Sequence, residues 1–319
     1  MINRFLNNVN NGKNDWWRYL ISIILTWIVS NFIGVFVLGF LVAVYFISIG
    51  TFDVNAMMDL INSYDYNIVF FFIMIFITIS FSLIFLFISL KFIHKRDFMS
   101  IVNFSGKYDE FSGKTISWIK RIRWKLMLKG ALIWLAFILV PFTIGVILEP
   151  ENLIINFNIE NLYLIIALFL LAIPIQVLFE ELFFRGYLNQ GLSLLTKKPL
   201  PIILASSIVF SIGHIFNGGA DPVFMATNVI MTLFVGIILS VATLVTNGIE
   251  WAVGAHFANN FFAFLISSSE GSIGTFETIV QTKTPTDPLL DLIFSTIFFV
   301  IFMVILFFYK KDKILKVFA

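Results

Sequence analysis

The residues best suited to chemistry lie within strongly apolar stretches of the sequence. The stretch VLFEELFFRGYL carries two glutamates and an arginine, FSIGH carries a histidine, and HFANN carries a histidine and an asparagine. A charged side chain at the centre of a bilayer costs about 2.5–3.5 kcal/mol on insertion scales, so such residues are candidates for a functional site. The candidates are Glu180, Glu181, Arg185, His214, His256 and Asn260.

Helix geometry separates the three charged residues of the first stretch. Glu181 and Arg185 are four residues apart, so they share a helix face and are predicted to form an ion pair. Glu180 is rotated by about 100° from Glu181 and is expected to have no partner on its own helix. A lone carboxylate in an apolar site suits a general base that works near neutral pH. The spacing therefore predicts a structural Glu181–Arg185 pair and a reactive Glu180.

The two histidine segments repeat this four-residue spacing. Phe210 precedes His214 by one helical turn, and His256 precedes Asn260 by one turn. His256 and Asn260 thus present two hydrogen-bonding groups on one face, which suits the oxyanion of a tetrahedral intermediate. A single histidine or asparagine of this kind also serves as a hydrogen-bonding link between helices. Here three separate apolar segments each supply polar residues of types that are used in hydrolysis, and this combination favours a reaction site over a link between helices.

The composition is that of a membrane protein. Of the 319 residues, 59% are hydrophobic and 13% charged, and the mean hydropathy is +0.96. Soluble domains have about 25% charged residues. There is no cysteine, which excludes disulfides, thiolate chemistry and cysteine-ligated zinc.

We expect an all-α polytopic membrane protein with about eight transmembrane helices, because a span needs about 20 apolar residues. The predicted spans are 20–49, 68–93, 130–148, 162–188, 199–216, 223–246, 249–268 and 288–309.

The basic residues predict the orientation of the chain. With eight spans, 20 of the 21 Lys and Arg residues fall on one side and only Lys283 falls on the other. This places both termini in the cytoplasm. The segment Ile116–Gly130 is basic and amphipathic and is predicted to lie as one helix against anionic lipids at the cytoplasmic face. His94, beside Lys95 and Arg96, is expected to be a solvated loop residue, and no nucleic-acid partner is expected.

Three ordered motifs carry a resemblance to a known family. Glu180-Glu181-x-x-x-Arg185, Phe210-x-x-x-His214 and His256-x-x-x-Asn260 occur in this order on successive apolar segments. This pattern resembles the CPBP family of intramembrane proteases, which comprises CAAX proteases and bacteriocin-processing enzymes and is also called the Abi family. The similarity covers about residues 162–268.

The resemblance implies the roles of the site residues. Glu180 and His214 would activate water, and His256 and Asn260 would stabilise the oxyanion, in a polar cavity reached from the cytoplasmic side. Glu181, Arg185 and Phe210 would support them. A divalent metal such as zinc, held by Glu180, His214 and His256, would also activate water. Both the metal-free and the metal-dependent version remain open at this point.

The resemblance also suggests a division of the chain. Residues 1–129 would form an accessory region with two spans and the basic amphipathic segment, and residues 130–161 a third span and an outer loop. Residues 162–268 would form the protease core. Residues 269–319 would supply an outer loop, the last span and a basic tail.

The predicted function is that of an intramembrane endopeptidase that cleaves a lipidated, leader-type or other membrane-anchored peptide, in a bacterial plasma membrane. One alternative is a non-catalytic scaffold or immunity protein that binds another membrane protein or peptide. Another is a proton-coupled transporter, because intramembrane Glu and His residues also serve proton relays. A transporter would predict a repeat between the halves of the chain, and the sequence shows none.

One geometric difficulty follows from the predicted spans. Counted along the helices, His214 lies about 20 Å from the inner face, whereas Glu180 and His256 lie in the cytoplasmic half. For the three to meet, the fifth helix must begin below the membrane, near Lys197–Pro201, or be strongly tilted. The first arrangement is the one that we expect.

Overall fold

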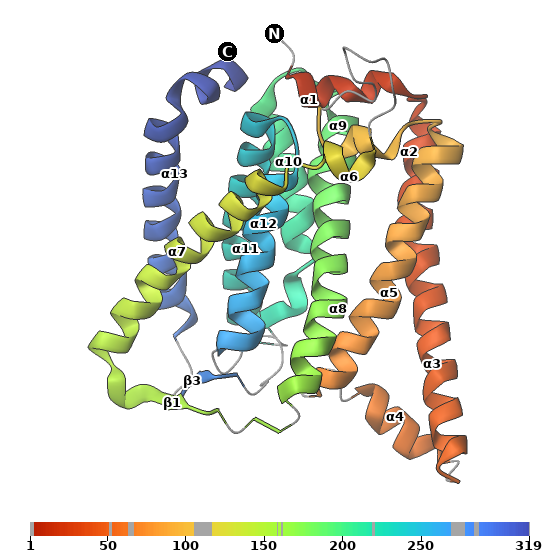
Figure 1. Cartoon of the computed structure of the whole chain (residues 1–319), viewed down its shortest axis with the longest axis vertical. Helices are drawn as coiled ribbons and strands as arrows, with labels where there is room; N and C mark the ends of the chain where they lie inside the picture. Colours follow the sequence, from red (N-terminus) through yellow and green to blue (C-terminus); the bar gives the residue numbers. More distant parts are fainter. Residues whose placement is uncertain are drawn as a thin grey trace.

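The computed structural model describes residues 3–50, 53–62, 67–104, 117–157, 159–160, 162–218, 221–268, 278–283 and 287–318. Within these ranges the chain is a bundle of helices with the N- and C-terminal ends at the same end (Figure 1). A small β-sheet lies at the opposite end, beside the start of the last helix. The two ends of the bundle are called the terminal end and the sheet end below.

The helices cover most of the described chain. In chain order they are α1 (Arg4–Asn7), α2 (Trp16–Ile23), α3 (Ser30–Ser48), α4 (Val54–Asn62), α5 (Ile68–Ile88), α6 (Trp118–Arg121), α7 (Trp124–Leu148), α8 (Leu162–Glu180), α9 (Asn189–Leu192), α10 (Pro199–Ile212), α11 (Pro222–Thr246), α12 (Glu250–Phe261) and α13 (Pro288–Phe318). π-Helical turns continue four of them, at Ile24–Val29, Ser89–Ile93, Glu181–Leu188 and Phe262–Ile266.

Six of these helical runs are long and apolar enough to cross a membrane, which makes the chain a multi-pass membrane protein. They are Trp16–Ser48, Ile68–Ile93, Trp124–Leu148, Leu162–Leu192, Pro222–Thr246 and Pro288–Phe308. The other two predicted spans correspond to the shorter helices α10 and α12. All eight predicted segments are therefore helical, while the count of eight crossings and the cytoplasmic termini stay predictions.

The small sheet was not predicted. Its strands are β1 (Leu153–Ile155), β2 (Ser267–Ser268) and β3 (Val280–Thr282), in the order β1-β3-β2. β3 pairs antiparallel with β1 and parallel with β2. Strands of two or three residues leave too little alternation for a sequence pattern to show.

The N-terminal segment packs onto the rest of the bundle at the terminal end. Phe5 and Leu6 are buried, and the Asn8 side chain donates hydrogen bonds to the carbonyls of Ser100 (2.9 Å) and Asn103 (3.1 Å). Further along the chain, α5 lies along α8. The region before residue 130 is thus joined to the rest of the bundle by buried contacts.

The prediction of one amphipathic helix over Ile116–Gly130 is wrong. Residue 116 lies outside the described residues, α6 ends at Arg121, and α7 begins at Trp124. The chain breaks there because Arg123 turns inward and pairs with Glu250, whose side chain is 1% exposed, with 2.9 Å between Arg123 Nε and Glu250 Oε1. A buried carboxylate at the start of α12 therefore fixes the start of α7.

The prediction for His94 is also wrong, because this side chain is fully buried. Its Nδ1 lies 2.8 Å from the Lys13 carbonyl and its Nε2 lies 2.8 Å from the Tyr187 hydroxyl. The N-terminal segment supplies the Lys13 carbonyl, a long-range contact that the local basic sequence does not reveal. Burial lowers the pKa of His94 below its usual value.

Helices α7 and α12 approach closely at two glycines. A Cβ on Gly254 would lie 1.9 Å from the Met127 carbonyl oxygen, and one on Gly130 would lie 2.1 Å from that of Trp251. Small residues permit such close contact between membrane helices. This contact matters for the site, because α12 carries His256 and Asn260.

We predict that Gly254→Ala destabilises the protein by about 1–3 kcal/mol, since the added methyl group must push α7 and α12 apart. The matched control is Gly145→Ala on α7, where a Cβ meets nothing within 4 Å. Thermal unfolding in detergent should show a lowered Tm for Gly254→Ala only. An equal effect of both changes would contradict the close approach.

We predict that buried His94 makes stability depend on pH. The unfolded histidine has a pKa near 6.5 and the folded one a lower value, so the unfolded state binds more protons below pH 6.5. The stability that neutral His94 contributes is complete above this pH and is lost as the pH falls towards the folded pKa. The fall in Tm from pH 7.5 to 5.5 should be smaller in His94→Gln than in the wild type. Equal falls would count against this account.

Candidate active site

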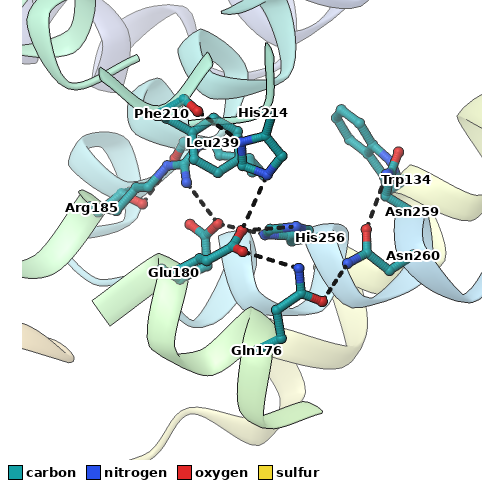
Figure 2. Close-up of polar contacts among 12 residues, drawn as sticks. Trp134, Gln176, Glu180, Arg185, Phe210, His214, Leu239, His256, Asn259 and Asn260 are labelled. Atoms are coloured by element: carbon teal, nitrogen blue, oxygen red, sulfur yellow. Dashed lines mark hydrogen bonds and ion pairs between the residues drawn. The ribbon is translucent and has the colours of Figure 1, made fainter. Parts of the chain in front are cut away.

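Three helical segments bring the predicted residues into one cluster (Figure 2). Glu180 ends α8, the π-helical turn after it carries Glu181 and Arg185, His214 follows α10, and α12 carries His256. The side chain of His214 is 18% exposed, whereas those of Glu180 and His256 are 9% and 6% exposed. The sequence therefore identified residues that the fold does collect in one place, well inside the bundle.

The Glu180 carboxylate lies between the two histidines. Its Oε2 is 3.7 Å from Nε2 of His214 and 3.7 Å from Nε2 of His256. These separations are longer than a direct hydrogen bond. Glu180 Oε2 is itself buried and has no hydrogen-bond partner among the described residues, so it is a free acceptor that faces both histidines.

The second ring nitrogen of each histidine is held by an acceptor. His214 Nδ1 lies 2.7 Å from the Phe210 carbonyl oxygen, and His256 Nδ1 lies 2.8 Å from Glu181 Oε1. Because a carbonyl and a carboxylate only accept, each Nδ1 carries a hydrogen and donates it. In the neutral rings, both Nε2 atoms therefore present lone pairs towards Glu180.

Glu181 and Arg185 form the predicted ion pair, with 2.9 Å between Nη1 and Oε1 and with side chains that are 0% and 1% exposed. The prediction assigned Glu181 to this pair alone, and the structure adds the contact to His256. The Arg185 guanidinium also lies 4.1 Å from the centre of the Phe210 ring. Phe210 thus covers the arginine by a cation–π contact and holds His214 through its carbonyl.

The prediction that Glu180 has no partner on its own helix is wrong. Gln176, one turn earlier on α8, donates from Nε2 to Glu180 Oε1 over 3.0 Å. The same spacing that revealed the Glu181–Arg185 pair also relates Gln176 to Glu180, so the sequence contained the signal.

Gln176 belongs to a chain of side-chain hydrogen bonds that ends at Glu180 (Figure 2). Trp134 Nε1 donates to Asn259 (3.2 Å), Asn259 donates to Asn260 (3.3 Å), and Asn260 Nδ2 donates to Gln176 Oε1 (3.4 Å). Each amide is oriented by the one before it. The result is that Asn260 points its amide nitrogen towards the carboxylate end of the site.

The depth of His214 follows from the lengths of the helices on either side of it. The helical run of α8 continues to Leu192, twelve residues and about 18 Å beyond Glu180. The chain then turns and α10 starts at Pro199, near the terminal end. His214 lies fifteen residues after Pro199, which brings it about 22 Å back towards the level of Glu180. The turn near Lys197 thus lies well beyond Glu180, in agreement with the first of the two expected arrangements. The Asn228 side chain then holds the His214 carbonyl at 2.6 Å.

The site opens into a cavity of about 820 Å³. Its polar wall includes Gln176, Glu180, His214, His256 and Asn260, and most of the remaining wall is aromatic or aliphatic. Asp291 also lines the cavity. The sequence analysis did not single out this residue, although it lies within the predicted span 288–309.

A metal is the alternative means of activating water, with Glu180, His214 and His256 as ligands. In the part of the chain that the structure describes, no group of three or more His, Asp or Glu side chains is arranged to hold a metal ion.

Comparison with known proteins agrees with the motifs. Residues 161–262 match the family described as type II CAAX prenyl endopeptidase Rce1-like, so this segment is a domain of the CPBP family. The whole chain is similar to the Bacillus subtilis (strain 168) "Uncharacterized protein YyaK", with 24% identity over 98% of each chain. No solved structure matches.

We predict that Arg185→Met destabilises the protein by about 3–5 kcal/mol, because it leaves the Glu181 carboxylate buried without its arginine. The double variant Glu181→Gln/Arg185→Met removes both charges and should recover much of this loss. Chemical or thermal unfolding in detergent measures both effects. If the double variant is less stable than Arg185→Met, the loss of stability comes from the missing ion pair and not from a carboxylate that is left buried without a partner.

Proposed function

We propose that the protein is an intramembrane peptidase in which Glu180 and His214 activate a water molecule for hydrolysis of a peptide bond. The observation that carries this proposal is the position of Glu180 Oε2, 3.7 Å from Nε2 of both histidines at the wall of a large cavity. The match of residues 161–262 to a family of CAAX endopeptidases supports the same reaction class.

Water activation uses two acceptors at once. A water molecule on the cavity side of Glu180 Oε2 and His214 Nε2 donates one hydrogen to each atom, which aims an oxygen lone pair into the cavity. As the oxygen attacks the carbonyl carbon of the substrate, one proton moves to Glu180. The carbon becomes tetrahedral, and its former carbonyl oxygen becomes an oxyanion.

His256 and Asn260 are placed to stabilise that oxyanion. His256 Nδ1 already donates to Glu181, so His256 donates from Nε2 only when both ring nitrogens are protonated. The Glu181 carboxylate stabilises this imidazolium. Asn260 Nδ2 spends one hydrogen on Gln176 and has a second one for the oxyanion.

The leaving group takes the proton that the water gave up. Glu180 passes it to the amide nitrogen as the C–N bond breaks, which releases an amine and a carboxylic acid that holds the water oxygen and its second hydrogen. That hydrogen leaves as a proton to solvent when the acid ionises. Having given up its proton, Glu180 is back in its starting state, and the site is ready for a second water molecule.

The substrate that we propose is a membrane-associated peptide, because the reacting groups lie inside a bundle with six helical runs that are long and apolar enough to cross a membrane. The similarity to a Bacillus subtilis protein supports a bacterial plasma membrane as the location.

We predict that Glu180→Gln abolishes cleavage, with a rate at least about 10²-fold lower, because the amide cannot accept the proton. The matched control is Glu160→Gln, the same chemical change on an exposed side chain. Membrane peptidomes of cells with wild type, Glu180→Gln or Glu160→Gln, at equal protein levels, measure the effect. One or a few peptides should appear with wild type and Glu160→Gln only.

The same experiment separates a peptidase from a scaffold. If the three peptidomes are identical while loss of the whole protein gives a phenotype that Glu180→Gln rescues, the reaction is not part of the function. The motif would then be a structural element of a non-catalytic membrane protein.

A further inference from the structure

The catalytic cluster lies at one end of its cavity. Along α12 and the π-helical turn after it, the lining residues run from His256 to Phe264 in the direction of β2, and no described residue of α12 before His256 lines the cavity. Along α5 the lining residues run from Phe71 to Ile79, in the half of that helix nearer the sheet end. From Glu180 the cavity therefore extends towards the sheet end and not towards the terminal end.

The last helix shows the same direction. Its lining residues lie between Asp291 and Phe299, in the first half of a helix that begins beside the sheet. On the opposite side of the cluster, the terminal end is filled by buried contacts. They include the His94–Tyr187 hydrogen bond, buried Phe5 and the Arg123–Glu250 ion pair. The distribution of basic residues predicts that the terminal end is cytoplasmic, so the cavity extends towards the outer face.

Asp291 is the second carboxylate on the cavity wall. It is half-buried, and no described residue donates a side-chain hydrogen bond to it or pairs with it. It lies in the first turn of a helix of membrane-spanning length, near the end of the span that is next to the sheet. The first turn of a helix favours a carboxylate, but it does not explain why this side chain faces a cavity of aromatic groups.

The distance between Asp291 and the catalytic cluster follows from helix contacts. Trp134 links the last helix to the site, because its Nε1 donates to Asn259 and the centre of its ring lies 5.7 Å from that of the Phe302 ring. Phe302 therefore lies at about the same height along the bundle as the catalytic cluster. Asp291 precedes Phe302 by eleven residues, which is about 16 Å along α13. An extended peptide covers about five residues in this distance.

We propose that the substrate enters from the sheet end, as an apolar peptide segment with a cationic nitrogen that pairs with Asp291 about five residues from the cleaved bond. This inference rests on the proposed peptidase function for the cleaved bond, but the direction of access and the cation preference are properties of the cavity alone. It differs from the cytoplasmic access that the family resemblance implies. A lysine or arginine side chain and a free amino terminus share the required chemistry.

The absence of cysteine permits a direct test that needs no catalysis. Ser295 lies one turn after Asp291 on the cavity wall, and Ser295→Cys gives a single reactive thiol there. The control is Leu195→Cys, at an exposed position on the turn between α9 and α10. Membrane-impermeant cationic and anionic methanethiosulfonates are added to spheroplasts or to inside-out vesicles, and the rates of modification are compared.

We predict that Ser295→Cys reacts from the outside of spheroplasts, whereas Leu195→Cys reacts in inside-out vesicles. At Ser295→Cys the cationic reagent should react about three- to tenfold faster than the anionic one, because Asp291 attracts the cation. Each rate is first divided by the rate of the same reagent with a free thiol in solution. Adding Asp291→Asn should remove this ratio. Modification of Ser295→Cys only in inside-out vesicles, or no modification while Leu195→Cys reacts, would overturn the direction of access. An unchanged ratio with Asp291→Asn would overturn the cation site.

A cleavage experiment tests the substrate class. The probes are apolar peptides of about 20 residues, each with one Lys or one Gln at successive positions and with a free or an acetylated amino terminus. Peptides with a cation about five residues from the cleaved bond should be cut at least about tenfold faster than their neutral partners, and Asp291→Asn should bring this ratio near one. A ratio that Asp291→Asn leaves intact would refute the proposal. If no probe is cut while the labelling results hold, the peptidase function fails and the cation-selective cavity stands.

Discussion

One carboxylate oxygen holds the charged part of this site together. Glu181 Oε1 accepts hydrogen bonds from both Arg185 and His256 in a place that solvent does not reach. Moving a charge from water into such a place costs several kcal/mol per ion, so neither group could remain there charged without a partner. The shared oxygen also sets the orientation of the His256 ring, which turns Nε2 towards Glu180. The position of the His256 ring beside Glu180 thus depends on Glu181.

The π-helical turn Glu181–Leu188 explains how two adjacent glutamates serve one histidine. On a regular α-helix their side chains point about 100° apart. In the structure, His256 lies between them, with Nδ1 at Glu181 and Nε2 towards Glu180. The wider helical turn begins at Glu181 itself, and π-helical turns within α-helices are frequent at functional sites. The carboxylate that orients the imidazole and the carboxylate that we propose as the reacting group are therefore neighbours in sequence.

The surrounding helices fix the position of His256 and direct the cavity. Gly130 and Gly254 let α7 and α12 touch, and the Arg123–Glu250 pair fixes where both helices begin. The N-terminal segment and the buried His94 then fill the terminal end. With that end filled, the open space beside Glu180 lies on the other side, between α5, α7, α11 and α13. The filled terminal end thereby leaves the cluster open in one direction, from which the proposed substrate would reach it.

By itself, the sequence determined the membrane class, the positions of the long helices, the Glu181–Arg185 pair and the residues that gather at the site. These features depend on local composition or on a spacing of four residues along one helix. Both can be read directly from the sequence. Gln176 and Asp291 were also within reach of such reasoning, since one has that spacing to Glu180 and the other is a charge in a predicted span. Only the tertiary structure decided that His94 is buried, that Arg123 interrupts a helix, and that Glu181 holds His256. Those features join residues that are 75 or more positions apart, and contacts of that range arise from the packing of helices against one another, which local sequence does not specify.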